Sequence, residues 1–289
     1  MPQLKVRGAE LEYREQGEGD ALVLVHGTQS DYRTWSGQLE RFGASFRTIA
    51  YSRRYHWPNA SIPAGADYSM VEQVEDLGAV IDALGERSAH VIGHSYGGYI
   101  ALLLAIREPG LIRRLVLAEP PVLPLYVSVP PRPWELLRLL LTRPRTAAAI
   151  VRFGARGVGP ATSAIRRGSR EAGLRLAASA VLGPETFKRL SAERLQQARD
   201  NLIDEEFLGS GFTALTDAEV SSVGHRTLLL GSTRSPPIFG FLLDRLQELL
   251  PDAERAEIPD ASHIMHEDNP DEFYEAVTAF LNAPEDPRP

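Results

Sequence analysis

The chain has 289 residues, a net charge of -7, no cysteine and a hydrophobic content of 43%. The length suits one large α/β domain or a core with an insertion, and the acidic charge argues against nucleic acid as the main partner because phosphate binding requires a basic surface. The lack of cysteine excludes disulfides, thiolate catalysis and cysteine-ligated metal. No segment has the pattern of a signal peptide or a membrane span, so we expect a cytoplasmic protein without a membrane partner.

Short apolar runs alternate with longer amphipathic stretches, a pattern typical of a parallel sheet with crossover helices. Residues 4–17 have a sequence pattern with a period of two on either side of a glycine turn, which predicts an antiparallel hairpin at the start of the chain. Further strands are predicted at residues 21–27, 46–52, 89–95, 113–120, 226–232 and 254–260. Helices are predicted at residues 70–85, 98–112 and 270–283. The fold class is therefore α/β.

One long segment, residues 122–222, breaks this alternation. It contains no convincing strand, but it has helical patterns at residues 133–142, 145–154, 161–183 and 185–202. About 100 residues are too many for a plain loop in a compact domain. We therefore predict a helical cap inserted between two parts of a core, with the division 1–121, 122–222 and 223–289.

The motif Gly93-His-Ser95-Tyr-Gly97 lies between a predicted strand and a predicted helix. A serine on such a tight turn adopts a strained backbone, and small residues two positions away allow neighbouring chains to pass close to it. The following helix directs free N–H groups to the same point, where they can stabilise an oxyanion. The context predicts a nucleophilic Ser95 rather than an incidental serine in a glycine-rich turn.

The motif, together with His26-Gly27 at the end of a strand and a late histidine, resembles the α/β-hydrolase superfamily. The resemblance covers residues 1–122 and 222–289 and leaves the cap undefined. It implies an α/β-hydrolase core with a mostly parallel eight-stranded sheet and an inserted helical cap.

The resemblance also implies roles for residues around Ser95. The backbone N–H groups of Thr28 and Tyr96 would form the oxyanion hole, and His26 would hold the loop behind it. His263 follows the small residues Ala261 and Ser262 where relatives carry the catalytic histidine. His266 stands where many relatives have a second, noncatalytic histidine, and it remains the alternative base.

The acid of a triad is missing from its usual place in this superfamily. The run ending at Ser232 is followed by Thr233, Arg234 and Ser235, none of which is a carboxylate. Some members carry the acid one strand earlier, where this chain has Glu119. The ends of neighbouring parallel strands lie close together, so Glu119 is predicted to orient His263. Asp260 and Asp244 are the alternatives.

Substrate contacts are less well defined. The loop that contains Tyr55 and His56 replaces a turn that is usual in relatives. Its bulky polar residues either bind the substrate or form a stacked structural loop. In the first case His56 could act as an extra acid or base. Between residues 132 and 175 the cap has ten arginines and two glutamates, and its apolar residues include Trp134. These residues predict amphipathic helices over the core or an apolar pocket containing an arginine.

The resulting expectation is a serine hydrolase that cleaves an ester or lactone of a largely apolar small molecule through an acyl-enzyme. The alternatives are C–C bond hydrolysis of a diketone-type substrate and a non-hydrolytic lyase or cyclase on the same fold. A binding protein is disfavoured by the intact serine, histidine and acid set. No metal or organic cofactor is expected, and the sequence defines no oligomeric state.

Overall fold

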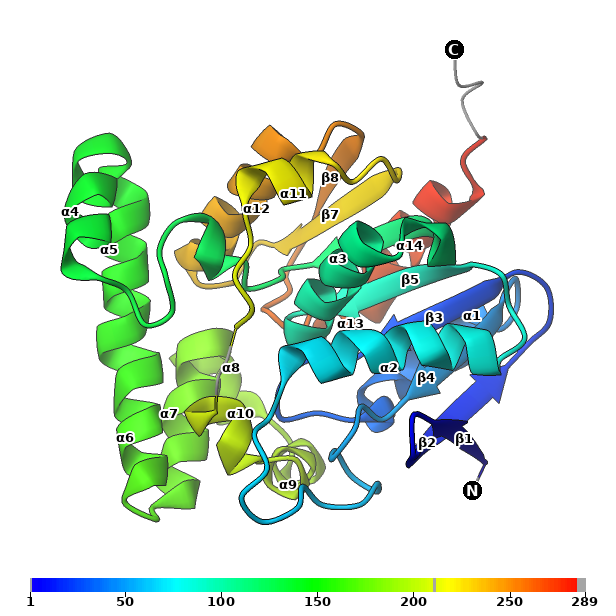
Figure 1. The fold of residues 1–289 in the computed structure, drawn as a ribbon, viewed down its shortest axis with the longest axis horizontal. Helices are drawn as coiled ribbons and strands as arrows, with labels where there is room; N and C mark the ends of the chain where they lie inside the picture. The colour runs from blue at the N-terminus through cyan, green and yellow to red at the C-terminus, as the bar shows by residue number, and fades with distance from the viewer. Residues whose placement is uncertain (1, 210–211, 285–289) are drawn as a thin grey trace.

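A computed structural model describes residues 2–209 and 212–284. These residues contain an eight-stranded sheet with the order β1-β2-β4-β3-β5-β6-β7-β8 (Figure 1). The strands are β1 Gln3–Val6, β2 Ala9–Gln16, β3 Ala21–Val25, β4 Arg47–Tyr51, β5 Ala89–His94, β6 Ile112–Ala118, β7 Thr227–Ser232 and β8 Ala253–Ile258. The β1–β2 and β2–β4 pairs are antiparallel and the other pairs are parallel. The predicted hairpin, the six further strands and the fold class are confirmed.

Burial explains why the central strands were recognisable from their sequence. Every residue of β3 and β5 is buried, as expected for parallel strands covered by helices on both faces. Alternate residues of β3 contribute to two separate cores: Val23 belongs to one face of the sheet, and Leu22 and Leu24 belong to the other. The edge strand β8 is less buried and carries charged residues, which suits an edge that must not pair with another chain.

Helices cover both faces of the sheet. The core that contains Val23 includes residues of α2 Met70–Ala83, α3 Tyr96–Arg107, α11 Asp217–Ser221 and α12 Pro237–Leu249. The opposite core includes residues of η1 Tyr32–Trp35, α1 Ser36–Phe42, α13 Met265–Asp268 and α14 Pro270–Asn282. A short 3₁₀ helix, η2 Pro109–Leu111, precedes β6.

The described part of the segment between β6 and β7 is helical. Besides α11, its helices are η3 Leu123–Leu125, α4 Pro133–Thr142, α5 Pro144–Phe153, the π-helix η4 Gly154–Val158, α6 Gly159–Arg166, α7 Arg170–Leu182, α8 Pro184–Arg189, α9 Ala192–Asp200 and α10 Asp204–Leu208. Figure 1 shows α4, α5 and α6 in a green column along the left side of the molecule. The division into core and cap domains stays a prediction.

Two details of the predicted cap helices are wrong. The helical pattern of residues 161–183 forms two helices because the chain turns at Gly168, whose φ of 75° favours glycine. The pattern of residues 185–202 is also interrupted, since the Ser191 side chain caps a new helix, α9. In addition, Trp134, Leu137 and Leu140 of α4 are exposed, although we expected the apolar face of this helix to cover the core.

The carboxyl ends of the parallel strands meet at one edge of the sheet, where ligands bind in open α/β folds. Ser95, Thr28 and Glu119 follow β5, β3 and β6 at this edge. The described helices include none that is both long and apolar enough to cross a bilayer.

Candidate active site

Ser95 occupies the turn between β5 and α3. Its φ of 53° and ψ of -122° are unfavourable for a residue with a side chain, so the surrounding structure must hold this conformation. A Cβ atom on Gly93 would lie 2.5 Å from the carbonyl oxygen of Gly97, and one on Gly97 would clash with the carbonyl of Val25. Gly93 is therefore required where β5 turns into α3, and Gly97 where α3 passes β3. Ser95 is partly exposed at this turn.

The loop after β3 passes directly beside Ser95. A Cβ atom on Gly27 would lie 3.0 Å from Ser95 Cβ, and Thr28 is the next residue. Tyr96 is the first residue of α3, so its N–H has no acceptor one turn back within the helix. His26 accepts a hydrogen bond of 2.9 Å at Nε2 from the backbone N–H of Arg53. The buried His26 thus ties the loop after β4 to the loop that carries Thr28, as predicted for a structural histidine.

Glu119 and His263 form a buried pair. His263 Nδ1 lies 2.6 Å from Glu119 Oε2, and both side chains are at most 2% exposed. Glu119 has a φ of 46° at the end of β6, which is a further strained position at this edge of the sheet. An ionised carboxylate only accepts hydrogen bonds, so a neutral His263 ring paired with it would donate from Nδ1 and keep Nε2 as an acceptor.

The residues after β7 support Glu119. Ser232 donates to Oε1 through its backbone N–H at 3.0 Å and through its hydroxyl at 2.9 Å. The hydroxyl of Ser235 donates to Oε2 at 2.7 Å. The segment that lacks the usual carboxylate instead supplies three donors to a carboxylate on the neighbouring strand.

The ring of His263 is fixed by its neighbours. It stacks on Phe239 with a centroid distance of 4.1 Å, and its backbone carbonyl accepts from His94 Nε2 at 2.7 Å. His94 immediately precedes Ser95, so this bond brings His263 next to the elbow. Nε2 of His263 is buried and has no hydrogen-bond partner among the described residues. A bond from Ser95 Oγ is thus not formed here, and bonds of this kind often tighten only when substrate is bound.

The alternative base and acids lie elsewhere. His266 Nε2 lies 2.9 Å from Thr34 Oγ1, and burial lowers the pKa of His266 to about 4. Asp260 forms an ion pair with Arg234, and both Asp260 and Asp244 have exposed side chains. Glu119 is therefore the carboxylate that the fold brings to His263.

The three predicted substrate contacts have different environments. His56 is fully buried, with Nδ1 2.9 Å from the carbonyl oxygen of Ser30, and burial holds its pKa well below the ordinary histidine value. Tyr55 is half-buried, and burial raises its pKa. Trp134 is 57% exposed on α4 and lines a cleft of about 230 Å³ together with Tyr126. The structure does not bring Trp134 to the Ser95 turn, and substrate binding by these three residues stays a prediction.

Arg53 and Glu206 form a second buried group, which sequence reasoning did not identify as a pair. The Arg53 guanidinium donates to the carbonyls of His26 and Gly27 at 3.0 Å each and to Glu206 Oε1 at 3.1 Å. It also lies over the ring of Tyr96, 5.0 Å from the centroid. Burial raises the pKa of Glu206, although Arg53 acts in the opposite direction. A carboxylate of α10 therefore lies beside Thr28, and its partner Arg53 lies over the ring of Tyr96.

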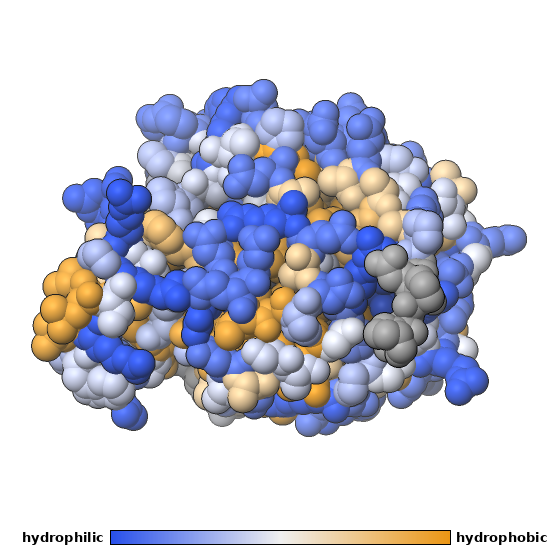
Figure 2. Space-filling model, turned by 90° about the horizontal axis from the view of Figure 1, so that it is seen from above, coloured by the Kyte–Doolittle hydropathy of each residue, from blue (hydrophilic) through white to orange (hydrophobic). Residues whose placement is uncertain are grey.

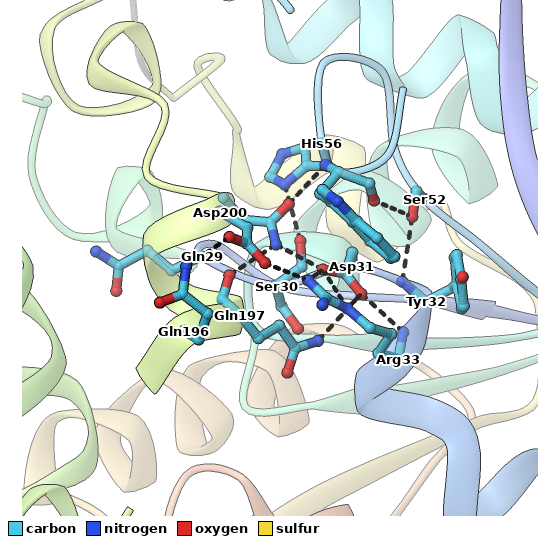
Figure 3. A network of polar contacts seen from close by, with 12 residues as sticks. Gln29, Ser30, Asp31, Tyr32, Arg33, Ser52, His56, Gln196, Gln197 and Asp200 are labelled. Carbon is cyan, nitrogen blue, oxygen red and sulfur yellow. Dashed lines mark hydrogen bonds and ion pairs between the residues drawn. The ribbon is translucent and has the colours of Figure 1, made fainter. Parts of the chain in front are cut away.

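A polar network attaches α9 to the loop after Thr28 (Figure 3). The carboxylate of Asp31 is fully buried and accepts from Gln197 at 3.1 Å and from Asn201 at 2.6 Å. Arg33 bridges Asp31 at 2.7 Å and Asp200 at 3.0 Å. These bonds fix the carboxyl end of α9 against the core, so this part of the cap and the Thr28 loop form one packed unit.

Within residues 2–209 and 212–284, no group of three or more His, Asp or Glu side chains has the arrangement of a metal site.

Curated relatives match only part of the chain. N-formylmaleamate deformylase from Pseudomonas putida is 38% identical over 109 residues, which is 38% of this chain and 40% of the relative. 2-Hydroxymuconate semialdehyde hydrolase from Pseudomonas putida is 38% identical over 113 residues, covering 36% of this chain and 37% of the relative. The matched region thus spans about two fifths of the length of these curated relatives.

The fold is similar to known structures over nearly its whole length. The enol-lactonase from Burkholderia xenovorans LB400 superposes with a TM-score of 0.76, covering 98% of this chain and 100% of the enol-lactonase at 20% sequence identity. At that identity the likeness concerns the fold alone. A family model described as "Alpha/beta hydrolase family" matches residues 22–276, and the chain therefore belongs to the α/β-hydrolase family of enzymes.

Proposed function

We propose that Ser95, His263 and Glu119 form a catalytic triad that hydrolyses an ester or lactone of a largely apolar small molecule. The observation that carries this proposal is the buried 2.6 Å contact between His263 and Glu119, close to a serine held in a strained turn. A histidine with one nitrogen bonded to a carboxylate and the other unpartnered is suited to act as a general base.

The reaction begins when Ser95 Oγ attacks the substrate carbonyl carbon and His263 Nε2 accepts the hydroxyl proton. Glu119 stabilises the imidazolium that forms, while the N–H groups of Thr28 and Tyr96 hold the oxyanion. The tetrahedral intermediate collapses when His263 returns the proton to the leaving alcohol. Water, activated by the same histidine, then releases the acyl group from Ser95.

The surroundings of His263 favour a substrate that is mostly apolar. Its ring stacks on Phe239, and Phe153 from the cap lies 6.2 Å from Phe239 between ring centroids. The ring centroids of Phe212 and Tyr96 are 5.7 Å apart. The ion pair between Glu206 and Arg53 is a polar element beside these aromatic residues. We therefore expect an acyl group with an apolar body and a single polar substituent.

Ester or lactone hydrolysis is the first choice for the bond that is cleaved, because the triad and the two oxyanion donors are sufficient for it. The 38% identity to 2-hydroxymuconate semialdehyde hydrolase supports C–C bond hydrolysis as the second choice. The triad would serve both reactions, because each delivers an acyl group to water.

A panel of aryl esters, lactones and a C–C hydrolase substrate, assayed in water enriched in ¹⁸O, tests this proposal. We expect ester or lactone turnover with ¹⁸O in the released acid, and no turnover by Ser95→Ala. Turnover of the diketone alone would select the second choice. Turnover without ¹⁸O in the product would instead indicate a lyase or cyclase.

A further inference from the structure

The outer surface of α4 and α5 is unusually apolar. Of the eight large hydrophobic side chains that are exposed in the described residues, all but Leu208 lie between residues 129 and 158. These seven are Val129, Trp134, Leu137, Leu140, Leu141, Val151 and Val158, which we call the apolar cap face. Figure 2 shows an orange patch at the left edge of the molecule, the side on which Figure 1 places α4 and α5.

Helix α4 differs from an ordinary surface helix because it has large apolar residues on its outer face as well as on its inner face. An ordinary surface helix directs its apolar stripe toward the core and its polar residues toward water. In α4 the only buried residue is Leu139, whereas Trp134, Leu137 and Leu141, spaced by three and four positions, form an exposed stripe. Leu141 is 77% exposed. This stripe is available for contact with something outside the chain.

Arginines accompany the apolar cap face. Arg138, Arg145, Arg152 and Arg156 are exposed, and in the part of the chain that the structure describes none of them forms an ion pair with a carboxylate. Residues 132–175 contain ten arginines and only two acidic residues, although the whole chain has a net charge of -7. The positive charge is thus concentrated where the exposed apolar residues are, and the remaining surface is acidic.

We infer that the apolar cap face binds the surface of an anionic lipid bilayer. Leucine and tryptophan side chains would enter the boundary between headgroups and acyl chains, and the arginines would contact the lipid phosphates. The acidic remainder of the molecule would be repelled, which orients the cap toward the bilayer. Helix α4 has ten residues and is too short to span a membrane, so it would lie in the interface.

A second copy of the chain is a poorer occupant of this face. In a two-fold symmetric dimer the same patch is present on both sides, so the four arginines of one copy would approach those of the other. Like charges at an interface oppose association. A bilayer rich in anionic lipid offers both an apolar layer and the opposite charge. The expectation of no membrane partner rests on the lack of a spanning segment, which surface binding does not require.

Docking would place the membrane next to the cap side of the site. Helix α5 presents Val151 and Arg152 to solvent, while the next residue, Phe153, packs toward Phe239 and hence toward His263. The inference itself does not depend on the reaction, because it rests on surface residues that lie outside the proposed triad.

The experiment is flotation of the full-length protein with vesicles of phosphatidylcholine alone or mixed with phosphatidylglycerol. We expect flotation with the anionic vesicles, weak flotation with neutral ones, and loss of binding at high salt. The double variants Leu137→Glu with Leu141→Glu, and Arg145→Ala with Arg152→Ala, should each weaken binding by about tenfold or more. Leu208→Glu and Arg87→Glu, at exposed positions outside the face, are the matched controls and should bind normally.

Folding of each variant is checked by thermal melting before flotation. The inference is overturned if the folded wild-type protein does not float with anionic vesicles, or if the control variants lose binding as strongly as the cap variants. It is also overturned if light scattering finds a dimer that Leu137→Glu with Leu141→Glu dissociates while lipid binding is absent, since the face would then join two copies.

Discussion

His263 and Glu119 are 144 residues apart in the chain, yet their side chains meet at 2.6 Å in a buried contact. Glu119 is anchored by Ser232 and Ser235, and Ser95 donates its backbone N–H to the carbonyl of Ala118 at 2.8 Å. The carboxylate and the proposed nucleophile are thus attached to the same end of β6. This arrangement explains why a triad acid is possible at Glu119.

Ser95→Ala should abolish turnover and leave stability nearly unchanged. The hydroxyl is at a partly exposed turn and is not part of the hydrophobic core. Steady-state kinetics and thermal melting check both parts. A variant that keeps activity within a few-fold of the wild type would exclude the covalent mechanism.

His263→Ala should lower kcat nearly as far as Ser95→Ala, because residues that act as a unit give non-additive losses. His266→Ala should be milder in its effect on kcat. His266 packs on Trp35 with a centroid distance of 4.3 Å, so its loss should mainly reduce stability. Parallel measurements of kcat and melting temperature separate the two effects, and the opposite ranking of kcat would assign the base to His266.

Glu119→Gln should lower kcat by roughly two orders of magnitude or more, with a small change in KM. An amide can occupy the same site but cannot stabilise the imidazolium, and the corresponding change in another triad enzyme costs about four orders. Near-full activity of this variant would show that the carboxylate is elsewhere.

A relocated acid should partly restore the rate of Glu119→Gln. Ser235 Oγ is already 2.7 Å from Glu119 Oε2, so adding Ser235→Asp introduces a carboxylate close to His263. Adding Arg234→Asp provides a comparison one residue earlier. Recovery is measured as kcat relative to Glu119→Gln alone, and no gain from either addition would argue against interchangeable acid positions on β6 and β7.

Asp31→Ala should lower the free energy of unfolding by about 3 kcal/mol, because it leaves Gln197, Asn201 and part of Arg33 without their buried acceptor. Asp200→Ala is the matched control. Its side chain is 23% exposed and it contacts the same arginine, so we expect a loss of about 1 kcal/mol or less. Urea unfolding measures both, and equal losses would mean that the Asp31 network contributes little to cap attachment.

Acid should destabilise the fold partly through His90. Burial lowers its pKa from 6.5 to about 4, so the unfolded chain binds a proton in this window while the folded chain does not. His90 makes its full contribution to the free energy of unfolding above the pKa of the unfolded chain, and this contribution falls as pH decreases from 6.5 toward 4. Between pH of about 7 and about 4.5, the wild type should lose about 2 kcal/mol more than His90→Gln. Equal losses would exclude this contribution.

The central strands and Ser95 could be predicted because their signals are local. Fully buried parallel strands are continuous apolar runs, and the elbow requires its glycines at fixed positions around the serine. Glu119 was predicted from the resemblance, because some members carry the acid after this strand, whose end neighbours the other strand ends at one edge of the sheet. The helix α12, which packs on β7, is not among the predicted helices, although its buried residues Ile238, Phe239, Leu242 and Leu246 recur at helical spacing.

Other features depend on contacts between distant segments. Asp31 and Asn201 are 170 residues apart, and Arg53 and Glu206 are 153 apart. Neither pair has a spacing or composition that marks it in one sequence. The exposed stripe on α4 has the same periodicity as a core-facing stripe, so the sequence could not indicate which way it faces.

The most direct test of the proposed triad is mass spectrometry of the folded protein after reaction with a fluorophosphonate, compared among wild type, His263→Ala and Ser95→Ala. The account predicts one adduct on the peptide containing Ser95 in the wild type, labelling slowed by at least about 100-fold in His263→Ala, and none in Ser95→Ala. An unlabelled wild-type protein, or an adduct that persists in Ser95→Ala, would contradict it.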